Sequence, residues 1–517
     1  MPRIPNFNRN QSFIFCPDDY IPEDSPVRIL DAFVNSLNLE ELGYITFASS
    51  APGQQPYSRF DLIKLHLYGY INGIRSSRKL AAECSRNIEL MWLINGISPS
   101  KSLISDFVKV NETAIQNTFK EFVLFLKFAG FVDNKAIVID GTKIRAQNSR
   151  TKYYSIKKID STIEYFESQI KHYTDLLKKA EAEDLSDKDI DENAIIPFKE
   201  KIDNYQKKVE QFTELKKNMK DQKLSQITLT DPDSRMMTSH GNSDISYNMQ
   251  TAVDAKNSLI VTTDVVSDIN DTNQLENMVD KAEETLGSVA DATIADKGYY
   301  NTSQIANCEA KGTDVYVKPS KSKNATNNSD YSIDKFTFDK ELNIYICPAG
   351  KHLTFKRNLS RRLNKTDAEA TVVGYEYFCS DCAGCPHLHQ CTNSVDGRRI
   401  TRNTNQDILD IIEKRFEENP EMYTIRKCVV EHPFGTIKRS LGYTYFLRRG
   451  LSAVKTEAAL ISLAYDLKRL VNISNLKEIT KKLREYSLRF HCIFYIFFHF
   501  FKKNIKLFSC QKNIYVL

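Results

Sequence analysis

The sequence predicts an α/β protein with a mixed-sheet core behind an all-helical N-terminal domain. An antiparallel helical hairpin and a Cys-rich segment are inserted into that core. Three observations lead to this class. The first 135 residues carry apolar residues mainly at helical spacing, later segments alternate short apolar strands with helices, and two stretches of different character interrupt them. A chain of 517 residues with 41% hydrophobic and 26% charged residues fits a globular protein, of about three or four units.

The N-terminal region predicts several short helices. DLIKLHLYGYING (61–73) has apolar residues at helical spacing and ends at an Asn-Gly stop signal. A second helix runs through RKLAAECSRN, and a third candidate of several turns spans 100–128. Basic residues near these helices favour a helix-turn-helix reader of duplex DNA; they are Arg75, Arg78, Lys79 and Arg86. A helical bundle that only packs against the core is the alternative interpretation.

The sequence of the expected core predicts a definite order of strands and helices. It begins at AIVIDGTKIRA (136–146), a buried strand expected to turn at Gly141. A β-hairpin around 255–257, a helix capped by Thr272, the strand ATIADKG, a second helix and the strand TDVYVKP follow. A late helix bears Glu431. This order is that of an RNase H-like core.

One insertion is a heptad-patterned segment. Apolar residues recur three and four apart from Ile156 to Ala180, and again from Ile195 to Phe212. Two such helices joined by a polar turn predict an antiparallel hairpin, interpreted as an arm inserted into the core. The predicted domains are a helical DNA-binding domain (1–135), the core (136–150, 226–320 and 400–472), the hairpin (151–225), a Cys-rich basic insert (321–399) and a tail of unknown order (473–517).

Three acidic residues follow apolar runs in widely separated parts of the chain. They are Asp140 in AIVIDGTKIRA, Asp296 in ATIADKGYYN and Glu431 in KCVVEHPFGTIKR. Such a set suits two Mg²⁺ or Mn²⁺ ions for phosphoryl transfer on nucleic acid, because these ions prefer oxygen ligands. Each acid alone is more often structural, as a turn residue or, for Glu431, as a helix-start residue. The metal-binding hypothesis rests on all three together.

Cysteines form the second feature. The chain has eleven, and five of them fall within 347–391, which argues for a reduced compartment and one local metal cluster. CxxC spacing suits a tetrahedral structural Zn²⁺. The predicted ligands are Cys347, Cys382, Cys385 and Cys391, with Cys379 in reserve, and His387 and His389 are less favoured. Free thiols or a redox pair are the alternatives.

Charge and hydropathy constrain partners. The net charge is only +5, but the basic run 351–365 and the group Arg398, Arg399 and Arg402 predict phosphate-facing patches. No secretory signal opens the chain. The apolar run 492–501 has about half the length that a membrane-spanning helix needs. No membrane partner is predicted.

Five blocks, in order, resemble those of the DDE transposases of bacterial insertion sequences. They are VIDGTKIRA, LTDPDSRMM, YNMQTAVD, IADKGYYN and VEHPFGTIKR. The resemblance covers roughly residues 15–470. It implies an RNase H-like fold and a metal-dependent triad falling on Asp140, Asp296 and Glu431.

Residues around Glu431 resemble the Tyr-Arg-Glu-Lys signature of that family. Tyr423, Arg426 and Lys438 are its other members. Four residues separate Arg426 from Glu431, one more than in the signature. Lys438 is expected to bind phosphate, with a solvent-exposed lysine as the alternative. Arg235 in DPDSRMM is expected to contact DNA. Its neighbours Asp231 and Asp233 are assigned as positioning or DNA-contacting residues.

The predicted function is metal-dependent cleavage of DNA at the element ends and strand transfer into target DNA. The expected partners are double-stranded DNA, as terminal inverted repeats and target, and a second copy in a synaptic homodimer. The expected location is the bacterial cytoplasm, in association with the nucleoid. An RNase H-like nuclease without strand transfer, and a catalytically silent DNA-binding protein descended from a transposase, are the alternatives.

Overall fold

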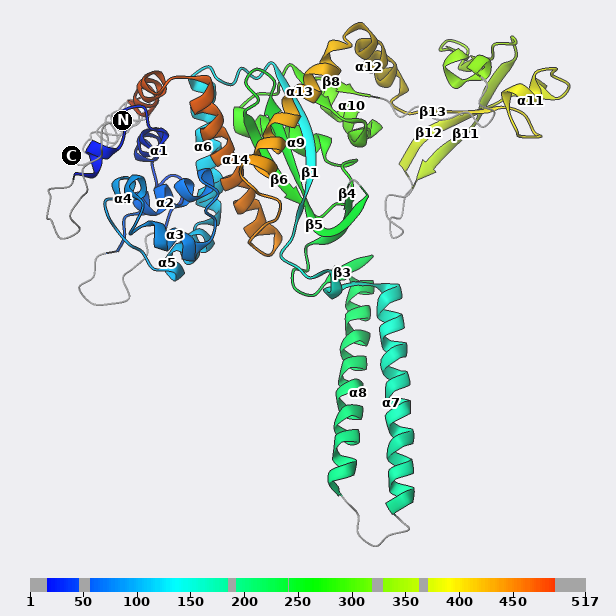
Figure 1. The fold of residues 1–517 in the computed structure, drawn as a ribbon. Helices are drawn as coiled ribbons and strands as arrows, with labels where there is room; N and C mark the ends of the chain where they lie inside the picture. Colours follow the sequence, from blue (N-terminus) through cyan, green and yellow to red (C-terminus); the bar gives the residue numbers. More distant parts are fainter. Residues whose placement is uncertain are drawn as a thin grey trace, which may run out of the picture.

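The computed structural model describes residues 16–45, 56–184, 192–239, 241–318, 329–361 and 371–488. A group of helices lies on one side of a central sheet, a long helical hairpin projects from one end of that sheet, and a second sheet stands apart on the opposite side (Figure 1). The mixed α/β class and the helical N-terminal region are confirmed. The apolar run 492–501 lies outside the described residues.

The N-terminal helices are short and pack around buried apolar side chains. They are α1 (Pro26–Asn35), α2 (Arg59–Ile71), α3 (Ser77–Glu83), α4 (Ile88–Leu93), α5 (Lys101–Val110) and α6 (Glu112–Phe128). The single helix predicted over 100–128 is wrong, because the chain breaks at Asn111. The buried Asn111 amide donates to Phe107 O and accepts from Ile45 N, so its side chain competes with helical bonding.

The central sheet has six strands. They are β1 (Ala136–Arg145), β4 (Arg235–Ser239), β5 (Asn242–Asp254), β6 (Ile260–Val266), β7 (Ala292–Ala295) and β8 (Asp314–Val317). The order is β4-β5-β1-β7-β8, with β6 also paired to β5. β5 is antiparallel to β1, β4 and β6, whereas β7 is parallel to both β1 and β8. The predicted hairpin around 255–257 is thereby confirmed.

Strand β1 does not turn at Gly141, as the sequence predicted, but continues to Arg145. It stays extended because β5 pairs with it along its whole length, from Ile137 to Arg145. β7 pairs only with Ala136–Ile139, so from Asp140 onward none of the described strands follows β1 on that side. Partners return at Arg145, which bonds the backbone of Thr444 and Phe446. The stretch 140–144 is therefore an open edge in the middle of the sheet.

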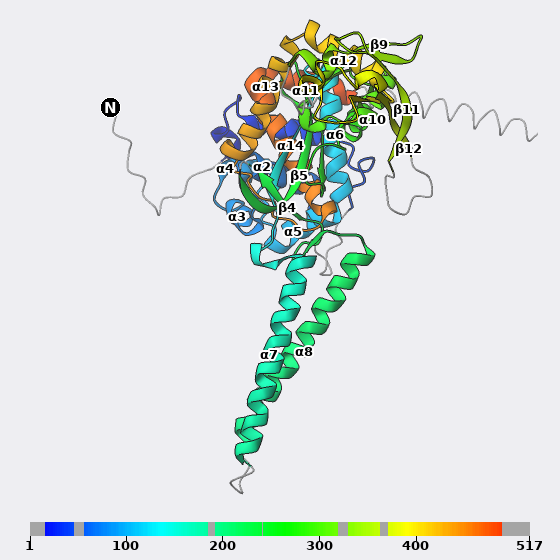
Figure 2. The same cartoon turned by 90° about the vertical axis from the view of Figure 1, so that its right-hand side faces the viewer.

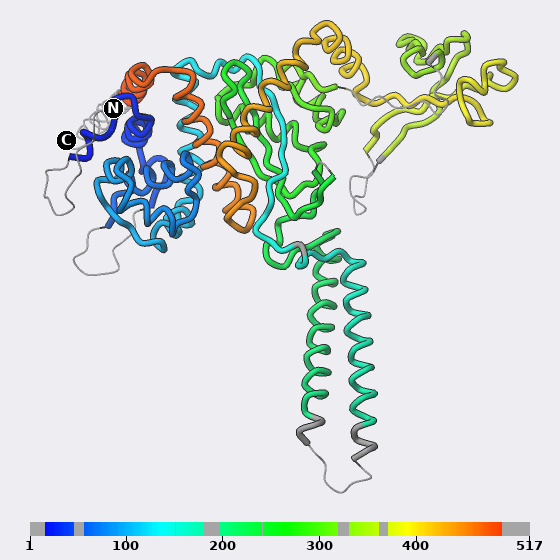
Figure 3. The backbone as a smooth tube through the Cα atoms, in the orientation of Figure 1, coloured from blue at the N-terminus to red at the C-terminus, as the bar shows by residue number. Residues whose placement is uncertain are grey.

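Helices cover the sheet. They are α9 (Leu275–Leu286), α10 (Thr302–Ala310), α12 (Gln406–Glu418), α13 (Glu421–Gly435), the π-helical turn η7 (Thr436–Ser440) and α14 (Leu451–Ile473). Helix α14 contacts β6, α6 and α2, so it joins the N-terminal helices to the sheet, as the trace in Figure 3 shows. α9 begins at Leu275 with Gln274 at its N-cap, so the predicted Thr272 cap is wrong.

Asp231 and Asp233 hold the beginning of α14. Asp231 is fully buried and accepts hydrogen bonds from Tyr247 Oη and Gly450 N, and Asp233 accepts from Leu451 N. Carboxylates at a helix N-terminus satisfy free N–H groups and favour the dipole. These hydrogen bonds support the positioning role expected for Asp231 and Asp233 more than the alternative role in DNA contact.

The helical hairpin consists of α7 (Ile156–Asp184) and α8 (Glu192–Asp221), which lie side by side away from the core (Figure 2). Stacked aromatic rings fill their seam, including Phe166 against Tyr205. At its base, β2 (Tyr153–Ser155) pairs with β3 (Gln226–Thr228) and fixes both helices to the core.

The second sheet has its own small core. Its antiparallel strands are β9 (Thr337–Asp339), β10 (Ile344–Ile346), β11 (His352–Arg361), β12 (Thr371–Phe378) and β13 (Arg399–Asn403). Phe336, Tyr345, Leu353 and Tyr377 pack together beneath it with two buried cysteines. In the described part of the chain no helix is long and apolar enough to cross a membrane.

Candidate nucleic-acid processing site

Asp140 and Asp296 meet at the open edge of β1. Asp140 is the first residue of β1 beyond the pairing with β7, and Asp296 is the residue immediately after β7 ends. Because β1 and β7 are parallel and in register, the two carboxylates emerge at the same level of the sheet. The Asp140 carboxylate accepts the N–H of Gly141, and the Asp296 carboxylate accepts the N–H of Lys297.

Arg426 on α13 bridges the two aspartates. Its Nη2 lies 3.4 Å from Asp296 Oδ2 and 3.8 Å from Asp140 Oδ2. Burial raises the pKa of Asp140 to about 6, although Arg426 and the Gly141 N–H act to lower it. The Arg426 Nε is buried without a hydrogen-bond partner. The site thus holds one acid, Asp140, that resists ionisation and a cation with a free donor.

A third carboxylate, Asp271, completes this cluster and was not predicted. Its Oδ1 accepts the amide N–H groups of Asn248 and Gln250, each at 2.7 Å, and lies 3.6 Å from Lys143 Nζ. Its charge raises the pKa of Asp140. Asp271 stands in a loop five residues after β6 with no apolar run directly before it, so the signal that marked the other acids was missing.

Gly141 allows the close approach of this cluster. A Cβ at position 141 would lie 2.4 Å from Gln250 Nε2 and 2.9 Å from Asp271 Oδ1. Both distances are shorter than van der Waals contact, so a side chain there would push the amide and the carboxylate away. The glycine after Asp140 is therefore required by packing rather than by a turn.

Lys438 reaches β1 two and three residues beyond Asp140. It lies in η7, and its Nζ donates to Thr142 Oγ1 at 2.5 Å and to Lys143 O at 3.1 Å. Burial lowers its pKa. π-Helical turns are often found at functional sites. The solvent-exposed alternative for Lys438 is wrong, because the side chain packs onto the open edge.

Glu431 lies on the same helical segment, between Arg426 and Lys438. It is exposed near the end of α13, so the helix-start alternative is wrong. Lys438 follows seven residues later, but the π-helical turn begins between them, so α-helical spacing does not put the two on one face. No hydrogen bond or ion pair joins Glu431 to Asp140 or Asp296 among the described residues. The structure brings the two aspartates together and places Glu431 on the helix that covers them.

Tyr423 and Arg235 differ in their distance from this cluster. The Tyr423 ring lies one turn before Arg426, whose guanidinium carbon is 5.7 Å from the ring centre. Arg235 is in β4, where its Nη1 donates to the carbonyls of Pro232 and Ser234. Since β5 lies between β4 and β1, Arg235 is separated from the acids by a strand.

The predicted zinc ligands share one small cavity in the second sheet. Cys347, Cys382, Cys385 and Cys391 line a space of about 20 Å³ together with Lys351 and Arg398. Cys347 Sγ accepts the backbone N–H of Lys351 at 3.1 Å. Cys379 is fully buried nearby and does not line it, and burial raises its pKa to about 12. All five are free thiols.

Neither cluster has the spacing of a formed metal site. In the part of the chain that the structure covers, no three His, Cys, Asp or Glu side chains are gathered closely enough to hold an ion. The donor types nevertheless fit their metals: carboxylates suit Mg²⁺ and thiols suit Zn²⁺.

One predicted phosphate-facing patch is in part wrong. Arg402 is buried: its guanidinium donates to Tyr345 Oη and Asp407 and lies 4.0 Å from the centre of the Phe338 ring. Its charge is paired within the protein, because Asp407 lies in the first turn of α12, shortly after β13 ends. Arg399 pairs with Asp396 at the surface.

A sheet edge with clustered carboxylates lies beneath a helix carrying arginine and lysine, and these groups could bind divalent ions and phosphate. Two family models match the chain: a Transposase DDE domain over residues 346–471 and a Transposase domain (DUF772) over residues 15–110. These two matches support a DDE-type transposase of insertion sequences, as the sequence blocks predicted. The interval that holds Asp140 and Asp296 lies between the two matches. No curated protein and no solved structure matched the chain.

Proposed function

We propose that the protein cleaves DNA at the ends of its element and joins the freed ends to target DNA, with Asp140, Asp296 and Glu431 as the catalytic carboxylates. The observation that carries this proposal is the meeting of Asp140 and Asp296, from distant parts of the sequence, around the shared guanidinium of Arg426. One carboxylate follows the end of β7 and the other lies in the middle of β1. The fold does not require two acids to be adjacent there, so their meeting favours a functional role.

The core in this proposal is RNase H-like. Its support is the order β6-β5-β1-β7-β8, in which the first three strands are antiparallel and the last two run parallel to β1. The acids then stand where the pairing changes, on the central strand and its parallel neighbour. Ligand sites in open α/β sheets commonly lie where the strand order changes direction.

The three carboxylates would hold two Mg²⁺ or Mn²⁺ ions, which supply an activated nucleophile and charge stabilisation at the transferred phosphoryl group. Arg426 keeps Asp140 and Asp296 close to each other while the protein is free. Its unpartnered Nε and its Nη groups can turn to the scissile phosphate, because guanidinium binds phosphate well. Arg426 thus acts as an internal counter-ion that exchanges partners when DNA binds.

Lys438 and Lys143 supply the remaining positive charge along the open edge. Lys438 already reaches across to the β1 backbone, so it needs little rearrangement to contact a phosphate lying over Thr142. Lys143 is held beside Asp271. Asp271 orients Lys143, Asn248 and Gln250, so we assign it as a positioning residue.

The other regions have supporting roles in this proposal. The N-terminal helices recognise double-stranded DNA at the element ends, and a homodimer brings two ends together. The hairpin and the second sheet are insertions into the core, which keeps the segments 136–150, 226–320 and 400–472. Arg235 and Tyr423 contact DNA outside the cluster. The protein acts on nucleoid DNA in the bacterial cytoplasm.

A structural zinc in the second sheet is part of the same proposal. Four cysteines from two segments line one cavity, and Arg398 beside it acts to lower the pKa of Cys391, although burial raises that pKa. The Lys351 N–H on Cys347 Sγ is the type of bond that stabilises a metal-bound sulfur. Cys347, Cys382, Cys385 and Cys391 would hold the ion, and Cys379 remains in reserve.

The test uses labelled duplexes that carry the inverted repeats flanking the coding frame. Wild-type protein with Mg²⁺ is expected to nick these ends and to produce joined strands with a target duplex. Asp140→Asn and Asp296→Asn should lower both rates by roughly a hundredfold or more, with DNA binding in EDTA unchanged. Asp291→Asn is the matched control, because Asp291 is exposed at the opposite end of β7.

Three outcomes discriminate between functions. Full cleavage by Asp140→Asn would overturn the assignment of the acids. Cleavage without joined products would identify a nuclease. Sequence-specific binding without any Mg²⁺-dependent cleavage by the wild type would identify a silent DNA-binding protein.

A further inference from the structure

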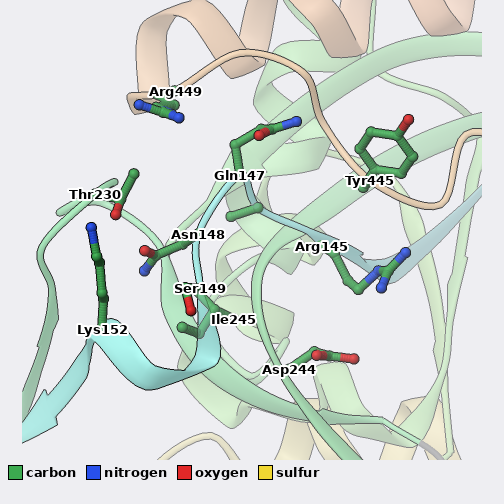
Figure 4. Close-up of a pocket in the computed structure, with 11 residues that line it drawn as sticks. Arg145, Gln147, Asn148, Ser149, Lys152, Thr230, Asp244, Ile245, Tyr445 and Arg449 are labelled. Atoms are coloured by element: carbon green, nitrogen blue, oxygen red, sulfur yellow. The ribbon is translucent and has the colours of Figure 1, made fainter.

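A large polar pocket lies at the far end of the open β1 edge. It has a volume of about 590 Å³. Its walls come from the end of β1, the loop 146–152 that leads to the hairpin, and the segment 445–449 before α14 (Figure 4). The lining residues that matter here are Arg145, Asn148, Lys152, Asp244, Tyr445 and Arg449.

Three cations surround this pocket. Arg145, Lys152 and Arg449 are exposed, and no ion pair involving any of them is recorded in the described part of the chain. Asp244 is the one acid on the wall. The pocket therefore has an excess of positive charge, and cations that point into a hollow rather than to carboxylates favour an anionic ligand.

Asn148 supplies unpaired hydrogen-bonding groups beside this pocket. Both Nδ2 and Oδ1 of its amide are buried and have no hydrogen-bond partner. Buried amides are nearly always bonded, because an unmet donor or acceptor costs about 1–3 kcal/mol. The amide stands in the pocket between Thr230 and Ser149 (Figure 4). It offers one donor and one acceptor, which is the pattern needed to bond the edge of a nucleobase.

Tyr445 adds an aromatic wall. Its side chain is 38% exposed, and the guanidinium carbons of Arg75 and Arg145 lie 4.9 and 6.0 Å from its ring centre. The backbone at Tyr445 bridges to Arg145. A ring fixed in this way provides a surface on which a base can stack.

The pocket and the carboxylates share one strand. Arg145 is five residues after Asp140 on β1, so the two lie about 16 Å apart at about 3.3 Å per residue. A duplex rises about 3.4 Å per nucleotide of each strand. The pocket is thus within about five nucleotides of a phosphate held at Asp140, and the edge between them carries Lys143 and Lys438.

We propose that this pocket binds a nucleotide of the DNA strand that leaves the catalytic edge, within about five positions of the cut. Lys152 and Arg449 hold its phosphates, Asn148 bonds its base and Tyr445 stacks on it. This inference rests on the proposed function, and it names the part of the protein that fixes the register of the DNA end over the acids.

The experiment measures binding of a fluorescent duplex carrying the terminal repeat, in EDTA so that no cleavage occurs. Lys152→Ala/Arg449→Ala should weaken binding at least tenfold and reduce the slope of log K against log salt by about 2, because each phosphate contact contributes about 0.9. Lys135→Ala is the control: Lys135 is exposed at the opposite end of β1, and its slope should remain that of the wild type.

Asn148→Ala tests the base contact separately. The substitution should weaken binding to the intact duplex. On a duplex that lacks the contacted base, at one abasic position within about five nucleotides of the cut, the variant and the wild type should bind equally. An unchanged slope for the double variant, or equal loss by Asn148→Ala on every abasic duplex, would overturn the inference. Competition by free dAMP at the same concentration as the duplex would also overturn the inference, because it would identify a site for free nucleotides.

The two proposals fail differently. If the pocket variants bind and cut like the wild type while Asp140→Asn is inactive, only the pocket assignment is wrong. If Asp140→Asn cuts normally, the proposed function is wrong whatever the pocket does. Unchanged thermal melting of each variant excludes misfolding as the cause of any loss.

Discussion

Arg426 Nη2 lies 3.4 Å from Asp296 Oδ2, so a helix late in the chain supplies the counter-ion for a carboxylate at the end of β7. The same nitrogen is 3.8 Å from Asp140 Oδ2. This relationship ties α13 to the open edge, and Arg426 lowers the pKa of Asp140 against the larger effect of burial.

The pH dependence of cleavage should follow from this contact. Burial raises the pKa of Asp140 to about 6, so at limiting Mg²⁺ cleavage should fall as the pH drops below about 6, where the proton displaces the metal. Arg426→Gln removes an interaction that lowers this pKa, so its acid limb should lie at higher pH. The measurement is the initial rate of cleavage from pH 5 to 9, and an acid limb that does not move would contradict the role of Arg426.

The same raised pKa has a consequence for stability. The folded state favours the protonated Asp140, so its contribution stabilises the fold below the ordinary pKa of 3.8 and is lost as the pH rises through about 6. Asp140→Asn keeps a neutral side chain at every pH. We therefore expect its melting temperature, relative to the wild type, to be higher at pH 7 than at pH 4, by calorimetry at both pH values.

Gly141→Ala should damage the site without touching any acid. The added methyl group would lie 2.4 Å from Gln250 Nε2, so Gln250 and Asp271 must shift. Overpacking of this kind costs about 1–3 kcal/mol, and cleavage should fall because Asp271 no longer orients Lys143. Gly435→Ala is the matched control, since nothing lies within 4 Å of its Cβ position. If Gly141→Ala melts and cuts like this control, the packing argument is wrong.

A buried ion pair joins the N-terminal helices to α14. Arg75 Nη1 donates to Glu457 Oε1 at 3.0 Å, and their side chains are only 7% and 0% exposed. Glu457 also accepts the N–H groups of Leu447 and Arg448. Arg75→Ala should destabilise the protein by about 3–5 kcal/mol, because it leaves a buried carboxylate without its cation. Chemical denaturation measures this loss, with Arg86→Ala, an exposed surface pair, as the control.

Metal analysis tests the cysteine cluster. Purified protein should contain one Zn²⁺ per chain, and Cys385→Ser should lower the zinc content and destabilise the second sheet. Cys16→Ser should change neither, because Cys16 is exposed outside this sheet. Absence of stoichiometric zinc from the wild type would leave the cysteines as free thiols.

Local sequence patterns were sufficient to predict the class of the protein and most of its elements. Apolar runs predicted β1 and β7, the heptad pattern predicted α7 and α8, and five ordered blocks predicted the family. These features are local, since strand and helix periodicity is written in neighbouring residues. Asp140 and Asp296 could be selected because each follows such a run, and the cysteines because their spacing is short.

The surroundings of those residues depend on contacts that form only in the folded chain. Gly141 resembled a turn, but pairing with β5 keeps β1 extended beyond it, and the early end of β7 creates the open edge. Asp271 is recognised as part of the cluster only from its hydrogen bonds with Asn248 and Gln250 of β5. The sequence predicted that Arg402 contacts phosphate, but in the structure its side chain is buried. Contacts between strands far apart in sequence depend on register and packing, which no local pattern encodes.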